Sequence, residues 1–222
     1  MMRLCVENFG GFFICEAPLI GAIHSTCDEF NYEFAEGIYV LSGEIDSGGW
    51  AFASSLAMSK KIDHRLLNQN IRLSFNGKIC SLDDIHRHTC DLSSSPTKSL
   101  VKKPHKSIYK RVQEGIQKNH LSFTPEEIRE MFFIDQERFK RPIHCVGHEI
   151  YRCNAAIGFV NDKDIYCFPW FSQKMVMSQI PGIRRTCETL AELGKIVLLP
   201  ISGNVAAFND YNIINFPNNL VR

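Results

Sequence analysis

A glycine-bounded loop between two apolar segments has the outline of a phosphate-binding site. Residues 38–41 resemble a strand, residues 43–49 (GEIDSGG) form the loop, and the apolar residues 50–58 resemble a helix. The pattern G-x-x-x-x-G-K-[ST] uses its lysine to neutralise phosphate and its hydroxyl to bind Mg²⁺. Starting this pattern at Gly43 puts Gly48 on the second glycine, Gly49 on the lysine and Trp50 on the hydroxyl. The sequence therefore predicts the backbone of a phosphate-binding loop that lacks both the lysine and the hydroxyl.

The rest of the loop also disfavours a bound triphosphate. Glu44 and Asp46 are carboxylates that repel phosphate, although backbone amides and a helix N-terminus retain a modest attraction for anions. Three readings stay open for this segment: a vestigial phosphate-binding loop, an ordinary strand-to-helix turn of another α/β protein, and a working phosphate cradle. Trp50 fits core packing, or it fills the volume that a nucleotide would occupy.

Composition indicates a reduced, globular protein. The chain has 222 residues, of which 45% are hydrophobic and 22% charged, and its net charge of +1 gives no reason to propose a nucleic-acid partner. We find no apolar run of the roughly 18–20 residues that a membrane helix needs. The nine cysteines include no C-x-x-C pair, which disfavours a zinc site and favours a cytosolic location.

Short apolar segments separated by turns predict a β-rich first third. We expect strands over residues 3–8 and 29–34, and a hairpin over residues 71–80 that turns at Asn76 and Gly77, because this pair supplies the positive φ of a type I′ turn. Residues 91–106 are polar, basic and rich in Ser and Pro, which predicts an exposed loop.

The remainder of the chain predicts helices and then strand–helix alternation. Helices are expected over residues 107–118, 124–133, 147–160 and 183–193, and Thr124-Pro125-Glu126-Glu127 forms a capping box. Strands are expected over residues 164–168, 195–201 and 212–216. Apolar strands that alternate with helices imply a parallel sheet covered on both faces.

The chain resembles the nucleotide-binding subunit of an ABC transporter, in segment order more than in identity. Residues 24–43 (HSTCDEFNYEFAEGIYVLSG) resemble the approach to the Walker A loop, and residues 73–79 (LSFNGKI) resemble the hairpin that follows it. Residues 145–172 (CVGHEIYRCNAAIGFVNDKDIYCFPWFS) resemble the run from the signature motif to Walker B. Residues 188–202 (ETLAELGKIVLLPIS) resemble the helix and strand that end at the switch histidine.

This resemblance implies one domain over residues 1–222, of α/β class. Its expected parts are a P-loop NTPase-like (RecA-like) core with a mostly parallel sheet, an antiparallel β subdomain and an inserted helical subdomain. Residues 1–90 would hold the β subdomain and the first half of the core, residues 91–155 the helical subdomain, and residues 156–222 the second half of the core.

The resemblance also implies that the catalytic positions are substituted. The Walker lysine position is Gly49, the Walker B aspartate position is Phe168, the catalytic glutamate position is Pro169 and the switch position is Ser202. Gly49 cannot neutralise phosphate charge, Phe168 cannot hold Mg²⁺, and Pro169 has no side-chain acceptor for the attacking water. Ser202 could donate only a weaker, shorter-reaching hydrogen bond to the γ-phosphate. The other positions that the resemblance assigns are the vestigial nucleotide-binding residues Gly43, Glu44, Ser47, Gly48 and Trp50, and the vestigial signature residues Cys145, Val146, Gly147 and His148.

The residue types around the signature segment also suggest a metal site or a nucleophilic cysteine. His144 and His148 have the i, i+4 spacing of metal ligands on a helix, and Cys145 with His148 has the residue types of a nucleophilic pair. No carboxylate completes a metal-binding motif, so no metal site is expected, and a spacing of three residues is by itself little evidence for the nucleophilic pair. The aromatic cluster around Phe168 indicates core packing or a partner surface, and the basic residues 102–106 indicate a solvated loop or a phosphate contact.

We expect a degenerate, non-hydrolysing ABC-type subunit with a structural or regulatory role. The resemblance implies another ABC ATPase subunit and transmembrane transporter subunits as partners, in a homodimer or heterodimer, with a cytoplasmic location at the inner face of the membrane. No cofactor is expected, and ATP with Mg²⁺ would bind only weakly. One alternative is a scaffold module on the same fold, independent of transport. Another is an active ATPase that uses Lys60 or Lys61, which lie about three helical turns from the loop.

Overall fold

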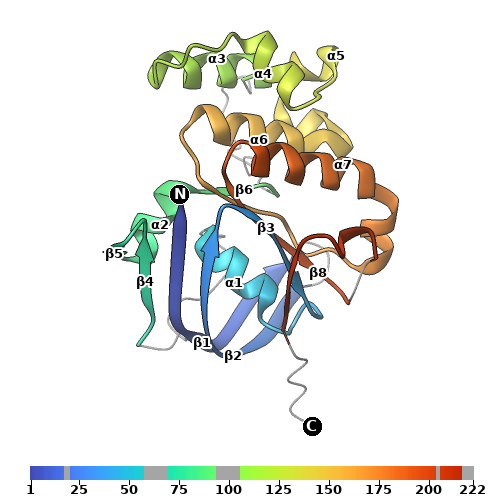
Figure 1. The fold of residues 1–222 in the computed structure, drawn as a ribbon. Coiled ribbons are helices and arrows are strands. Elements are labelled where there is room, and N and C mark those ends of the chain that lie inside the picture. Colours follow the sequence, from blue (N-terminus) through green and yellow to red (C-terminus); the bar gives the residue numbers. More distant parts are fainter. Residues whose placement is uncertain (18–20, 58–69, 94–105, 204–205, 217–222) are drawn as a thin grey trace.

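A five-stranded parallel sheet lies at the centre of the molecule (Figure 1). The computed structural model describes residues 1–17, 21–57, 70–93, 106–203 and 206–216. In spatial order the strands of this sheet are β6 (Thr89–Asp91), β7 (Ile165–Cys167), β8 (Ile196–Ile201), β3 (Gly37–Ser42) and β9 (Asn212–Asn215). All of their pairings are parallel, as the sequence predicts.

An antiparallel sheet lies beside this core. Its strands, in spatial order, are β2 (Gly21–Ala35), β1 (Arg3–Ala17), β4 (Arg72–Phe75) and β5 (Lys78–Cys80). The two strands expected near the N-terminus are parts of longer strands of 15 residues each. The predicted hairpin is confirmed, because Asn76 and Gly77 have φ of 51° and 78° between β4 and β5.

Alternating side chains of the parallel sheet enter two separate cores. In β3, Ile38 and Val40 join a core with the helices α3, α6 and α7, whereas Tyr39 and Leu41 join a core with α1 and the antiparallel sheet. Both faces are therefore covered, as the continuous apolar character of β3 and β8 predicts. Figure 1 shows α6 and α7 on one side of the sheet and α1 with β1 and β2 on the other.

Most of the helices expected from the sequence are present. Their bounds are α1 (Gly49–Leu56), α2 (Leu82–His88), α3 (Ile108–Lys118), α4 (Pro125–Met131), α5 (Gln136–Phe139), α6 (Ile150–Val160) and α7 (Gln173–Glu192). Short 3₁₀ turns cover Ile143–Cys145, Gly147–Glu149 and Ala206–Phe208. The Thr124 capping box is confirmed: the Thr124 side chain accepts from the amide of Glu127, whose carboxylate accepts from the Thr124 amide.

Several boundaries differ from the prediction for physical reasons. Helix α7 begins at Gln173, ten residues before the predicted start, because Ser172 caps it and Pro181 is accommodated inside it. Helix α6 begins at Ile150 because 3₁₀ turns replace its expected first turn. The expected loop over residues 91–106 begins inside β6, and its residues 94–105 lie outside the described residues. The subdomain boundaries at residues 91 and 156 stay predictions.

Candidate functional site

The carboxyl ends of β3, β8 and β7 lie side by side at one edge of the parallel sheet. Because parallel strands end at the same edge, the segments that follow them meet there, and ligands of α/β proteins bind at such edges. The loop from Gly43 to Gly48 follows β3, Ser202 follows β8, and Phe168 with Pro169 follows β7. The fold thus gathers the loop with three of the positions that the sequence analysis singled out.

The loop after β3 is closed on itself. The Ser47 amide and the Ser47 hydroxyl both donate to the carbonyl oxygen of Glu44, at 3.0 and 2.7 Å. A Cβ atom at Gly43 would lie 2.2 Å from Ser47 Oγ and 2.7 Å from the carbonyl oxygen of Phe216, so only glycine fits there. The amide of Ser47 is therefore already paired within the loop.

Two aromatic residues from other elements hold this closed loop. Trp170 follows β7 and donates its indole N–H to the carbonyl oxygen of Gly43 at 3.2 Å. Phe216 follows β9, donates its amide to the carbonyl oxygen of Ser42 at 2.8 Å, and packs its ring against Gly49. No motif in the sequence assigns Trp170 or Phe216 to the site, and only their positions just beyond strands β7 and β9 indicate them.

The first turn of α1 is packed into the core. Trp50 is 9% exposed and belongs to the core shared by α1 and the antiparallel sheet. Gly48 has φ of 97°, a left-handed conformation that favours glycine, and a Cβ there would lie 2.7 Å from Cys27 Cβ. Cys27 is buried, and this burial raises the pKa of its thiol to about 12. The segment from Gly48 to Trp50 is therefore enclosed by protein atoms.

Apolar groups occupy the segment after β7. The Phe168 side chain is 2% exposed, and its ring contacts those of Tyr151 and Phe171 at centroid distances of 5.5 and 6.1 Å. The Phe168 amide donates to the carbonyl oxygen of Leu198 on β8. Neither Phe168 nor Pro169 carries a side-chain oxygen that could hold a hard cation or accept a proton from water.

A side-chain hydrogen bond between Ser202 and Glu44 links the loops after β8 and β3. The Ser202 hydroxyl donates to Glu44 Oε1 at 2.9 Å. This bond directs a carboxylate, and not a cation, toward the carboxyl edge of the sheet. A negative group at this position repels phosphate.

Residues 145–148 lie apart from that loop, in the turns before α6. Arg138 of α5 donates to His148 Nε2 at 3.1 Å and pairs with Glu149, which also accepts from the Asp135 amide. Cys145 is exposed, and Gly147 has φ of 58° with open space around its Cα. Within the described ranges, His, Cys, Asp and Glu form no cluster of three that could hold a metal.

Comparison with known structures identifies the fold. No family model matches the sequence, and no curated protein matches it. A putative ABC transporter ATP-binding protein from Pyrococcus furiosus superimposes with a TM-score of 0.59 at 12% identity, over 96% of this chain and 97% of that one. An ATP-binding subunit of an ABC transporter superimposes with a TM-score of 0.59 at 13% identity, over 96% of this chain and 85% of that one.

This chain has an ABC-ATPase-like fold. The P-loop NTPase-like core, the antiparallel sheet and the helices expected from the sequence are all present in it. Identities of 12% and 13% establish the fold and do not transfer an activity, because one fold supports many functions. Among the described helices, none combines the length and the apolar character needed to cross a bilayer.

Proposed function

We propose that this chain is a non-hydrolysing ABC-type subunit with a structural or regulatory role beside an active ATPase and membrane subunits. The closed loop after β3 carries this proposal, because the amide of Ser47 is already bonded to Glu44 and Gly43 leaves no space beside Ser47. A phosphate that used the Ser47 amide would have to displace the bond from this amide to Glu44.

The side chains around the loop support the same reading. The positions that would neutralise, coordinate or orient a triphosphate hold Gly49, Phe168, Pro169 and Ser202. Phosphoryl transfer depends almost entirely on positioning and charge stabilisation, so each substitution adds to the loss. ATP and Mg²⁺ are therefore not cofactors of this chain in our proposal, and its role lies in its contacts with other proteins.

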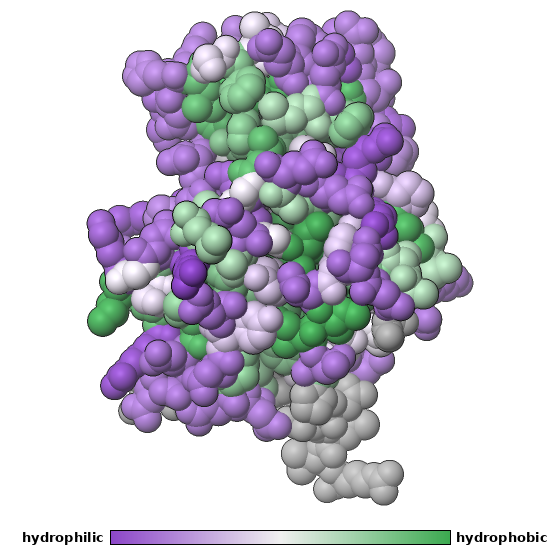
Figure 2. All heavy atoms as spheres, in the orientation of Figure 1, coloured by the Kyte–Doolittle hydropathy of each residue, from purple (hydrophilic) through white to green (hydrophobic). Residues whose placement is uncertain are grey.

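Exposed apolar side chains on the helical layer supply a surface for such contacts. Tyr109 of α3 is 37% exposed, and Phe133, which follows α4, is 48% exposed. On the face shown in Figure 2, apolar patches lie over the upper helices and beside the parallel sheet, with hydrophilic residues between them. Met175 and Met177 near the start of α7 are 45% and 60% exposed. Aromatic residues and methionine are enriched at protein interfaces, which supports a partner surface on these helices.

The partners in our proposal are a second ABC-type ATPase and transmembrane subunits, in a homodimer or heterodimer. The chain would then act in the cytoplasm, held at the inner face of the membrane by those subunits. This assignment rests on the likeness of the fold to ATP-binding proteins of ABC transporters.

Two measurements test the proposal. Titration of a fluorescent ATP analogue with Mg²⁺ into the purified chain should show no saturable binding below 1 mM, and phosphate release should equal the buffer blank. Saturation at micromolar ATP would contradict the closed-loop argument.

Cross-linking of the tagged chain in native cells should capture an intact ATPase and a polytopic membrane protein. The yield of both should fall after Phe133→Ala. Recovery of soluble proteins alone would favour the scaffold alternative.

A further inference from the structure

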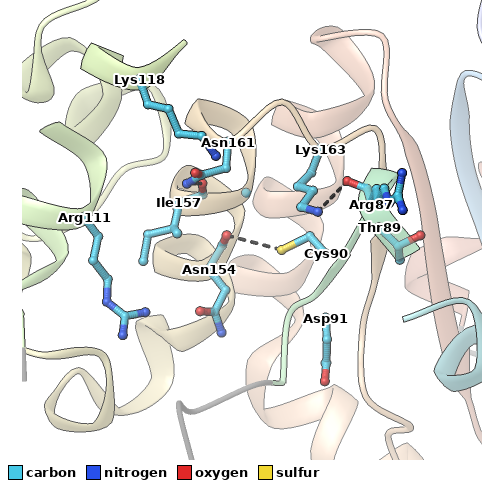
Figure 3. A pocket seen from close by; sticks show the side chains of 11 residues that line it. Arg87, Thr89, Cys90, Asp91, Arg111, Lys118, Asn154, Ile157, Asn161 and Lys163 are labelled. Carbon is cyan, nitrogen blue, oxygen red and sulfur yellow. Dashed lines mark hydrogen bonds between the residues drawn. The ribbon is translucent and has the colours of Figure 1, made fainter. Parts of the chain in front are cut away.

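A cavity of about 540 Å³ lies between α3, α6 and β6, away from the loop after β3 (Figure 3). Figure 3 shows Arg111 and Lys118 reaching from α3 on one side, and Lys163 with Arg87 on the other. A neighbouring hollow of about 400 Å³ shares Arg111 and Lys118 and extends the space along α3. The cavity is of the size that small-molecule sites have, about 300–1,000 Å³.

Positive charge dominates this cavity. Its lining contains the cationic residues Arg87, Arg111, Lys118 and Lys163 and a single carboxylate, Asp91, in a chain whose net charge is only +1. Asp91 Oδ1 accepts from the amide and the hydroxyl of Ser93 at 2.8 and 2.6 Å, so part of its charge is engaged by its own turn.

The side chains on α3 lack a neutralising partner. Across the described residues, neither Arg111 nor Lys118 forms an ion pair with a carboxylate. The connection from β6 to α3, residues 94–105, contains no Asp or Glu that could supply one. Lys118 lies in the last turn of α3, where a cation interacts favourably with the helix dipole. Arg111 lies in the first half of α3, where a cation gains nothing from the dipole.

Lys163 lies across the cavity from α3, and its charge is partly offset by the neighbouring carboxylates of Asp162 and Asp164. Its ammonium donates to the carbonyl oxygens of His86 and Arg87 at the end of α2. Burial lowers the pKa of Lys163, and the positive charge of Lys118 lowers it further, although Cys90 and Asp164 act in the opposite direction. A bound anion would relieve this repulsion between the two walls.

Close packing fixes the walls of the cavity. A Cβ at Gly115 of α3 would lie 2.5 Å from Val160 Cγ2 of α6, and a Cβ at Gly158 would lie 2.8 Å from Cys90 Sγ of β6. The Asn119 amide group also donates to the carbonyl oxygen of Val160 at 2.7 Å. The cationic side chains therefore project from a preorganised frame, which lowers the entropic cost of binding.

We propose that this cavity binds a small anion that carries two or more phosphate groups. Arg111 and Lys118 are seven residues apart on α3, about 10 Å along the helix, a spacing that lets each of them bind a different phosphate group of one ligand. A phosphate group carries about −1.5 to −2 charges and three acceptor oxygens, which suits paired cations better than a carboxylate does. No aromatic ring lines the cavity among the described residues, so a nucleobase would find no stacking partner.

Calorimetric titration with tripolyphosphate tests the site. We expect saturable binding at about 50 mM salt and at least tenfold weaker binding by the variant Arg111→Gln/Lys118→Gln. The matched variant Lys110→Gln/Lys174→Gln removes the same charge from exposed positions outside the cavity, and its affinity should stay within twofold of the wild type. Citrate should bind at least tenfold more weakly than tripolyphosphate.

Each alternative result overturns the proposal. Absence of binding at 1 mM tripolyphosphate excludes the site. An equal loss of affinity in both double variants would show that binding depends only on the net charge of the surface, and not on the cavity. Equal affinity for citrate excludes the preference for phosphate. Thermal unfolding of both variants separates lost binding from lost structure. The outcome is independent of the ATP titration, because the cavity and the loop after β3 share no residue.

Discussion

The hydroxyl of Ser202 donates a hydrogen bond to the carboxylate of Glu44 at 2.9 Å, and this bond joins the loops after β8 and β3. In the ABC-type resemblance, Ser202 stands at the switch position and Glu44 lies inside the Walker A loop. The two segments that would contact a γ-phosphate in our alignment thus contact each other. This exposed bond is one of several contacts that keep the loop closed.

A double-mutant cycle measures that contact. Ser202→Ala and Glu44→Ala should each lower the free energy of unfolding by less than about 1 kcal/mol, because an exposed hydrogen bond contributes little net stability. The double variant should cost less than the sum, since both changes remove the same bond. Glu44→Gln, which keeps the acceptor oxygen, should stay near the wild type in urea unfolding. Fully additive costs would show that the bond contributes nothing in solution.

Gly43→Ala tests whether the loop has any spare volume. The new methyl group would meet Ser47 Oγ at 2.2 Å and the carbonyl oxygen of Phe216 at 2.7 Å, and overpacking of this kind costs about 1–3 kcal/mol in urea unfolding. Adding Ser47→Ala should not restore stability, because the Phe216 backbone remains. A neutral Gly43→Ala would show that the loop opens readily.

The matched control for this change is Gly182→Ala inside α7. A Cβ there meets only the mobile end of the Arg152 side chain, at 3.4 Å, and φ is not positive. Replacing a helix-interior glycine by alanine should raise the free energy of unfolding by about 0.5–1 kcal/mol. The two glycine variants should therefore shift the denaturation midpoint in opposite directions.

Trp50→Ser restores a hydroxyl where the phosphate-binding pattern has one, and it should nevertheless fail to produce ATP binding. Trp50 is 9% exposed, so removing its ring should cost about 3–5 kcal/mol of unfolding free energy. Met177→Ala, at a site 60% exposed on α7, should change stability by less than about 0.5 kcal/mol. Saturable binding of a fluorescent ATP analogue by folded Trp50→Ser would show that Trp50 alone blocks the site.

Periodicity and turn chemistry in the sequence predicted the frame of this fold well. The Asn76-Gly77 turn, the Thr124 capping box and the apolar strands β3 and β8 were each identified from local residues. These features depend on nearby side chains, so a single sequence contains the information. Helix α2 and strand β6 were not predicted, because they have only seven and three residues. Their polar residues leave too few apolar positions to show a helical or strand periodicity.

The closure of the site could not be predicted in the same way. Trp170 and Phe216 reach Gly43 and Gly49 from 127 and 167 residues away in the chain, and no spacing rule connects such positions. The cationic cavity is another long-range feature, because Arg111 on α3 and Lys163 line the same cavity only through the packing of α3 on α6. The degeneracy of the nucleotide positions stays a prediction from the resemblance, and the experiments above address it.

Thiol reactivity should separate Cys145 from the buried cysteines. Cys145 is exposed, whereas Cys27, Cys153 and Cys187 are buried, and burial raises the pKa of each of their thiols. Because the thiolate is the nucleophile, a raised pKa keeps these buried groups protonated and unreactive at pH 8. The exposed Cys145 should react quickly with a disulfide reagent. Cys145→Ser should remove one equivalent from the fast phase. In guanidinium chloride the wild type should titrate all nine thiols and the variant one fewer. An unchanged fast phase in Cys145→Ser would show that the turn before α6 is closed in solution.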